Sequence, residues 1–204
     1  MSEPAERQRV SAPAPVPLCG SEFGGAGGLR LMSYMTPGKI PVGYSITQKR
    51  AAKGFKKEKL PRFGKIPSRK IGLSPLLLRH AFSDRSIVMV TEGLGPQPFH
   101  GRIVLLVNQH TASAAETITG FAKENKLATI VGTKTPGQVL GGTGFKMGRG
   151  FVLRIPVVTF HTWSGSTLEG KGVEPDCVSD VSRKELKAGR DTQLCRGIEI
   201  VSCL

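Results

Sequence analysis

The residue with the clearest catalytic potential in this sequence is Ser113, in the stretch VNQHTASAAETITG that runs from Val107 to Gly120. An apolar run, RIVLLVN, ends before Ser113, and apolar residues with helical spacing follow it, which predicts a strand followed by a helix. The backbone N–H groups at such a junction point at open space and favour negative charge. A serine nucleophile needs donors of this kind for its oxyanion, together with a base for its proton. Serine at a helix start is also a common cap, and Thr111 is a second candidate cap.

A strand, a helix and a second strand are predicted to hold Ser113. The apolar runs SIVMVTE and GRIVLLVNQ have β-branched residues typical of strands, ASAAETITGFAKEN has helical spacing at Ala114, Ile118, Phe121 and Ala122, and ATIVGT from Ala128 is a further strand. A strand, helix and strand within about 35 residues form a βαβ unit, whose two strands are parallel. The sequence therefore predicts an α/β fold.

The rest of the chain is less regular. Residues 1–19 predict a disordered or irregular tail, and residues 20–204 a single domain that opens with a glycine-rich loop and a short helix, LRLMSYM. The segment VGYSITQKR predicts a strand with Val42, Tyr44 and Ile46 on one face. Further predictions are a helical turn in PLLLRHAF, extended β structure in GFVLRIPVVTFHTW, a turn-rich return in LEGKGVEPD, and a terminal helix capped by Asp191 with Leu194, Ile198 and Val201 inward.

The net charge of +14 is concentrated in one segment, because 10 of the 29 basic residues lie between Lys49 and Lys70, where Glu58 is the only acid. We interpret residues 49–70 as a solvated, mobile surface loop, and contact with an acidic partner such as nucleic acid or anionic lipid is the alternative. No specific nucleic-acid binding is expected, since Phe55 and Phe63 are the only aromatic residues there.

Composition excludes several other classes of protein. No apolar run is long enough to span a membrane, and the first residues do not form a signal peptide, so the chain as written is expected to be cytoplasmic. The cysteines show no CxxC pair and no metal-like spacing, which predicts reduced structural residues and no metal site. No cofactor is expected either. These cysteines are Cys19, Cys177, Cys195 and Cys203.

Three motifs in order resemble the tail-specific, or C-terminal processing, serine peptidases. They are VLLVNQHTASAAETITGF, ATIVGTKTPGQV and SGSTLEGKGVEPD, and the match runs without a gap from Arg102 to about Val178. The resemblance places the family nucleophile on Ser113, one oxyanion donor on the amide of Ala114, and the acidic residue of the motif on Glu116. It implies a Clp protease/crotonase-like core, proteolysis, and a protein or peptide substrate. Members of the family are often exported.

The position of the family's base departs from the pattern. The lysine belongs 25 residues after the serine, where this chain has Gln138, and a neutral amide cannot accept a proton near pH 7. Lys134 is a substitute candidate from the same predicted turn. The chain therefore resembles a branch of the family, similar to the tricorn protease and the retinoid-binding module, that lacks this lysine. The tricorn proteins of that branch use a histidine from the beginning of the domain instead. The histidines here are each interpreted as structural: His80, His100, His110 and His161.

The resemblance also bears on the start of the domain. The family's DLRGNxGG segment, whose glycine amides complete the oxyanion hole, corresponds to CGSEFGG, so Gly24 and Gly25 are candidate donors. Proline-rich APAPVPL replaces the preceding strand, which predicts a core that is incomplete at its N-terminus. An open sheet edge would favour pairing with a second copy, so a homo-oligomer is an expectation. A catalytically silent relative that binds a peptide or an apolar ligand is the alternative to a peptidase.

Overall fold

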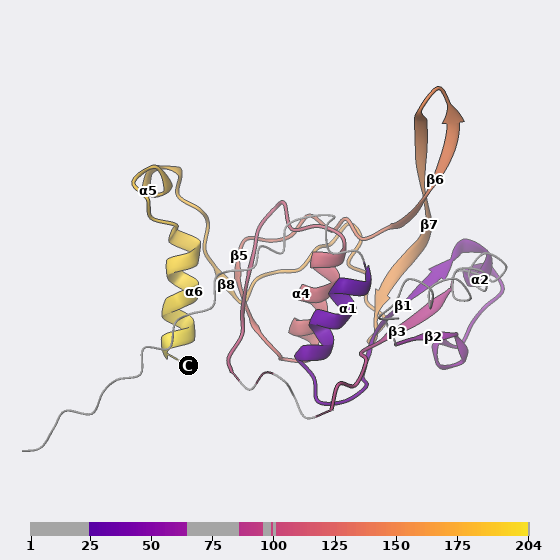
Figure 1. Cartoon of the computed structure of the whole chain (residues 1–204), viewed down its shortest axis with the longest axis horizontal. Helices are drawn as coiled ribbons and strands as arrows, with labels where there is room; N and C mark the ends of the chain where they lie inside the picture. The colour runs from indigo at the N-terminus through magenta and orange to yellow at the C-terminus, as the bar shows by residue number, and fades with distance from the viewer. Residues whose placement is uncertain (1–24, 65–85, 96–98, 100, 204) are drawn as a thin grey trace, which may run out of the picture.

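The protein is described by a computed structural model over residues 25–64, 86–95, 99 and 101–203. Two β-sheets lie on either side of a pair of helices, α1 and α4 (Figure 1). The elements follow one another in the order α1 (Gly25–Tyr34), β1 (Pro41–Thr47), α2 (Gln48–Ala52), η1 (Lys57–Lys59), β2 (Arg62–Phe63), β3 (Ile87–Val90), β4 (Val104–Val107), α4 (Ala114–Glu124), β5 (Thr129–Gly132), β6 (Gly141–Gly148), β7 (Phe151–Thr162), β8 (Cys177–Val178), α5 (Arg183–Lys187) and α6 (Thr192–Cys203).

The predicted βαβ unit is confirmed as β4, α4 and β5. The two strands pair in parallel, from Val104 beside Thr129 to Val107 beside Gly132, and β8 joins the outer side of β5, also in parallel. Because Gly132 has φ 138° and an added Cβ would lie 1.8 Å from the Val107 carbonyl oxygen, only glycine fits there. Because the three strands are parallel, their carboxyl ends lie on the same side of the sheet, and the chain passes from the end of β4 to the start of α4 there.

The second sheet has five strands in the order β2, β3, β1, β7 and β6. Its central strand β1 is antiparallel to both β3 and β7, and the predicted face is confirmed, because Val42, Tyr44 and Ile46 are all buried. The prediction that this strand continues through QKR is wrong. Thr47 ends the strand and its hydroxyl accepts from the Arg50 N–H, which starts α2 instead.

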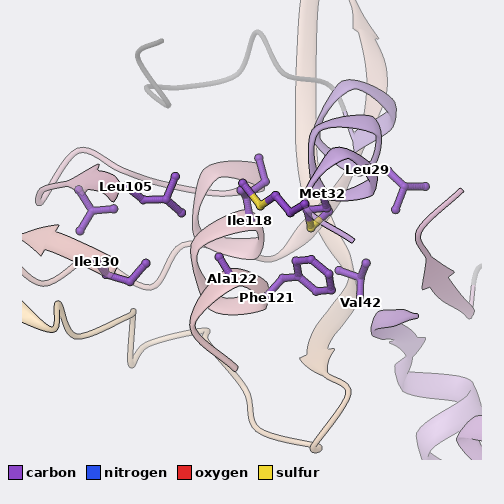
Figure 2. Close-up of a cluster of buried hydrophobic side chains, with 10 residues drawn as sticks. Leu29, Met32, Val42, Leu105, Ile118, Phe121, Ala122 and Ile130 are labelled. Atoms are coloured by element: carbon purple, nitrogen blue, oxygen red, sulfur yellow. The ribbon is translucent and has the colours of Figure 1, made fainter. Parts of the chain in front are cut away.

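The largest hydrophobic cluster lies between the two sheets. Figure 2 shows α4, with Ile118, Phe121 and Ala122, between the three-stranded sheet of Leu105 and Ile130 on one side and Met32 of α1 and Val42 of β1 on the other. The remaining buried members come from α1, β1, β4 and β5 and the residues that follow them: Leu29, Met32, Met35, Val42, Leu105, Val107 and Ile130. Helix α4 is therefore fixed from both sides, and so is the residue at its N-terminus.

The glycine-rich loop predicted after residue 20 is in part a helix, because α1 begins at Gly25 and includes Gly27 and Gly28. A Cβ on Gly28 would lie 3.4 Å from Ile118 Cδ1, so the small residue lets α1 approach α4 closely. The predicted helical turn in PLLLRHAF lies outside the described residues. Residues 49–64 are not one loop, since α2, η1 and β2 occupy them.

The terminal helix α6 is confirmed, and Asp191 Oδ1 caps it by accepting from the N–H groups of Gln193 and Leu194 at 3.0 Å each. Its predicted inward face is wrong for two of the three residues, since Leu194 is half-buried but Ile198 is 53% exposed and Val201 is 40% exposed. Helix α6 is buried instead at Gln193 and Gly197, where the absent side chain of Gly197 allows contact with Leu106.

Strand β6 and helix α5 were not predicted. The extended segment predicted at residues 150–163 is β7, and it forms an antiparallel hairpin with β6 that projects from the body of the molecule (Figure 1). Residues 168–176 contain no helix or strand, as the turn-rich reading predicts, and Gly170 and Gly172 have positive φ values of 69° and 68°.

Candidate active site

Ser113 lies where strand β4 gives way to helix α4. After β4 ends at Val107, the chain turns through Asn108 and Thr111: the Thr111 hydroxyl accepts from the Asn108 N–H at 3.0 Å, and the Thr111 N–H donates to the Asn108 carbonyl at 2.9 Å. Thr111 thus closes the turn and does not cap the helix. Helix α4 begins at Ala114, which makes Ser113 the N-cap residue.

The backbone of Ser113 has an unusual conformation, with φ 59° and ψ −122°. A non-glycine residue seldom adopts a positive φ, and such conformations cost on the order of 1–3 kcal/mol and cluster at functional sites. Ser113 and Glu116 form a capping box, in which each side chain faces the backbone N–H of the other residue, and the Ser113 N–H donates to Glu116 Oε2 at 3.3 Å. Ser113 is exposed, and its hydroxyl makes no cap hydrogen bond.

Glu116 is the organising residue of the site. Its carboxylate is fully buried, at 0% exposure, and accepts four hydrogen bonds from two separate segments. Oε1 accepts from the Thr135 hydroxyl at 2.5 Å and from the Gly137 N–H at 2.6 Å, and Oε2 accepts from the Gln138 N–H at 2.7 Å besides the N–H of Ser113. Because these four donors stabilise the carboxylate, Glu116 can be buried without an ion pair to a basic side chain. The bonds tie the loop after β5 to the start of α4.

Gln138 is held against Ser113 through its main chain. The Gln138 carbonyl accepts from the Ser113 N–H at 2.9 Å, while the Gln138 N–H donates to Glu116. The structure therefore brings the two positions that the resemblance pairs, nucleophile and base, side by side. The Gln138 residue is exposed. Its side-chain amide can donate to or accept from a hydroxyl or a water, but it takes no proton at neutral pH.

The other candidate bases have contacts of their own, and none has a hydrogen bond to Ser113 among the described residues. Lys134 is directed to Glu174, with Nζ 2.7 Å from Oε1, and both side chains are more than half exposed. His110 is exposed, and its Nε2 lies 3.5 Å from Gln109 Nε2. His161 stacks on Tyr44 in the other sheet, with ring centroids 5.1 Å apart and an interplanar angle of 11°. His80 and His100 lie outside the described residues.

The three candidate oxyanion donors, Ala114, Gly24 and Gly25, differ in what the structure describes of them. The Ala114 N–H is at the first position of α4 and donates no hydrogen bond within the described part of the chain, so it is available to an acceptor beside Ser113. Gly25 is the first residue of α1, and Gly24 lies outside the described residues. In the parts that the structure describes, no group of three or more metal-ligating side chains occurs, and no helix is long and apolar enough to cross a membrane.

The four-donor role of Glu116 was missed at the sequence level. The resemblance placed an acidic residue there, but its partners, Thr135 and the amides of Gly137 and Gln138, are about 20 residues away. The signal that could have identified it is the S-x-x-E spacing of Ser113 and Glu116, which is typical of a capping box. The reach of the same carboxylate to a second loop depends on tertiary structure.

Comparison with known proteins now identifies the family. The model of peptidase family S41 matches residues 30–179. The carboxy-terminal-processing protease of Bartonella bacilliformis is 33% identical over 92 residues, which is 45% of this chain and 21% of that protein. The carboxyl-terminal-processing protease of Synechocystis is 31% identical over 103 residues, which is 49% of this chain and 24% of that one. This chain thus matches about a fifth to a quarter of the length of these relatives.

Solved structures agree on the fold. A candidate peptidase from Parabacteroides merdae superposes with a TM-score of 0.60 at 16% identity, over 87% of this chain and 48% of that one. The photosystem II D1 C-terminal processing protease superposes with a TM-score of 0.53 at 20% identity, over 84% and 34%. The α/β core is thus the Clp protease-like fold of these peptidases, and with the family match over most of its length the chain belongs to peptidase family S41.

Proposed function

We propose that this chain supplies the nucleophile and an oxyanion donor of a serine peptidase site that acts on a protein or peptide. The observation that carries the proposal is the conformation of Ser113: an exposed serine at the start of α4 is held at positive φ by hydrogen bonds from its N–H to Gln138 and Glu116. Its hydroxyl is left available for chemistry.

The reaction would proceed by acyl transfer. Ser113 Oγ attacks the peptide carbonyl, the Oγ proton leaves to a base, and the tetrahedral oxyanion accepts from the Ala114 N–H with the help of the α4 dipole. Collapse breaks the C–N bond, the amine leaves with the proton, and water later hydrolyses the acyl-enzyme. Gln138 is not the base of this sequence, and Lys134 is held by Glu174.

A second candidate function rests on Gln138 itself. An amide at the position of the family's lysine supports a catalytically silent relative that binds a peptide or an apolar ligand at the same place. The two functions differ in one property, which is the reactivity of the Ser113 hydroxyl. They share the fold and the loop geometry set by Glu116.

An active-site-directed fluorophosphonate probe distinguishes the two functions. We expect the wild-type chain to be labelled, the Ser113→Ala variant to be unlabelled, and a control variant at another exposed serine, Ser166→Ala, to be labelled as wild type is. A folded wild-type chain that takes no label contradicts the peptidase proposal. In that case Gln138→Lys tests the silent alternative, because labelling gained by this variant, and not by Gln138→Met, would show that the base alone is lacking.

A further inference from the structure

A strongly basic surface lies on the elements that follow β1, away from the Ser113 site. Residues 48–64 contain seven lysines and arginines and one acidic residue, Glu58. Five of these basic side chains are exposed, and none of the five is paired with an acidic side chain in the part of the chain that the structure describes. We call them the basic face: Lys49, Lys53, Lys56, Lys59 and Arg62.

The basic face is built on a fixed scaffold. Leu60 is buried at 5% exposure in a cluster with Tyr44 and Val88, and the short strand β2 pairs in parallel with β3. Lys57 is held apart from the other lysines, since its Nζ donates to the Trp163 carbonyl at 2.7 Å and lies 4.4 Å from the centre of the Trp163 ring. The five basic side chains thus lie on or beside α2, η1 and β2, within 14 residues of one another, with Glu58 as the only acidic residue among them, so this surface carries a net positive charge that attracts anions.

The types of side chain that lie between the basic residues favour a lipid surface over nucleic acid as the partner. Residues 48–64 contain one glutamine, Gln48, and no serine, threonine or asparagine, so they are poor in the side chains that accompany lysine and arginine at sugar, phosphate and base edges. Apolar groups occupy exposed places instead: Ala51 and Ala52 on α2, and one side of Phe55, which is 37% exposed and packs against Tyr44 with ring centroids 5.8 Å apart. Lysines interspersed with small and aromatic apolar groups suit the boundary between anionic headgroups and acyl chains.

We propose that the basic face is a docking surface for an anionic lipid bilayer. The ammonium groups of Lys53 and Lys56, on either side of the turn at Gly54, contact the headgroups, and Phe55 between them contacts the outer acyl region. Each basic residue close to such a surface contributes about 1 kcal/mol, which corresponds to roughly a fivefold change in affinity. The attachment is independent of the peptidase proposal, because the surface includes no residue of the Ser113 site.

Vesicle binding of the full chain tests this inference. Sedimentation with vesicles of phosphatidylcholine containing phosphatidylglycerol, compared with phosphatidylcholine alone, is expected to show binding to the anionic vesicles only, and the loss of most of it in 0.5 M salt. The double variant Lys53→Gln, Lys56→Gln is expected to bind roughly 20-fold more weakly. The matched control, Lys184→Gln with Lys187→Gln on α5, removes the same charge from another exposed helix and is expected to bind within about twofold of wild type.

Three results would overturn the inference. Equal binding to neutral and anionic vesicles excludes recognition of anionic lipid. Equal losses in the two double variants show that net charge, and not this face, is responsible. Binding of single-stranded RNA at a salt concentration that releases the vesicles assigns the basic face to nucleic acid. Circular dichroism of each variant establishes that a loss is not due to unfolding.

Discussion

Replacing Glu116 by glutamine tests whether one buried carboxylate holds the Ser113 site together. The substitution keeps the size of the side chain but changes one oxygen, an acceptor, into an NH2 group, a donor. Each oxygen of Glu116 accepts two hydrogen bonds, so either orientation of the glutamine amide turns its NH2 group toward two donors. At Oε2 the Gln138 N–H loses its acceptor, whereas the Ser113 N–H keeps the Gln138 carbonyl.

The expected change in the free energy of unfolding depends on how many buried donors lose their acceptor. A buried donor without a partner costs about 1–3 kcal/mol, and bonds to a charged acceptor are at the upper end. The removal of a buried charge offsets part of the loss. We therefore expect Glu116→Gln to lower the free energy of unfolding by about 2–3 kcal/mol, and to lower the melting temperature by about 5–10 °C in a chain of this length.

Urea unfolding is the direct assay, because Trp163 is the only tryptophan and reports on the chain without a label. The control is Glu124→Gln on the same helix, whose exposed carboxylate accepts one hydrogen bond, from the Ser164 N–H at 2.8 Å, and whose loss should cost less than about 1 kcal/mol. Equal stability of the two variants would show that the four hydrogen bonds of Glu116 do not hold the site together. Fluorophosphonate labelling of Glu116→Gln should fall together with stability, since the same bonds position Ser113.

Three smaller perturbations follow from the same geometry. Ser113→Gly should raise the free energy of unfolding by about 1 kcal/mol in a urea titration, because glycine relieves the positive φ, whereas Ser113→Ala, which keeps the strain, should not. Lys134→Gln should change stability by less than about 0.5 kcal/mol and leave labelling intact, because its ion pair is exposed; lost labelling would make Lys134 the base. Desolvation raises the pKa of Asp176, but the Ile130 N–H and the Lys123 ammonium outweigh it, and the pKa is lowered. A lowered pKa stabilises the fold above the unfolded value and loses this effect as pH falls, so Asp176→Asn should be less stable than wild type at pH 7, with a difference that shrinks below about pH 4.

The local pattern of apolar residues was sufficient to predict the βαβ unit that carries Ser113. It was not sufficient to predict strand β6. The spacing of Ile118, Phe121 and Ala122 predicted α4, and both flanking apolar runs proved to be parallel strands. These signals are local, because each element buries one face against its immediate neighbours. Strand β6 escaped prediction because its sequence, GGTGFKMG, is rich in glycine and has no apolar alternation.

The inward face of α6 failed for a different reason. Periodicity identifies an apolar stripe, but it does not say how much of the stripe a neighbour covers. Contact at Gly197, a residue without a side chain, turns the burial toward Gln193, whose Nε2 donates to the Val107 carbonyl at 2.8 Å. A polar side chain and a glycine thus make the contact where apolar residues were expected, and neither carries a hydrophobic signal in the sequence.

The N–H groups at the start of α4 have separate partners, which would allow the buried Glu116 carboxylate and the proposed nucleophile Ser113 to be neighbours. The positive end of the helix favours both the Glu116 carboxylate and an oxyanion formed at Ser113, so the two charges would compete for the same donors. They do not, because the Ser113 N–H is committed to Gln138 and Glu116, whereas the Ala114 N–H has no acceptor in the described part of the chain. The Ser113 amide is therefore used for structure, and under the proposed function the Ala114 amide is the one that would receive the oxyanion. If the proposed function holds, the free Ala114 N–H supplies the oxyanion donor and the general base is the part of the site that Gln138 does not provide.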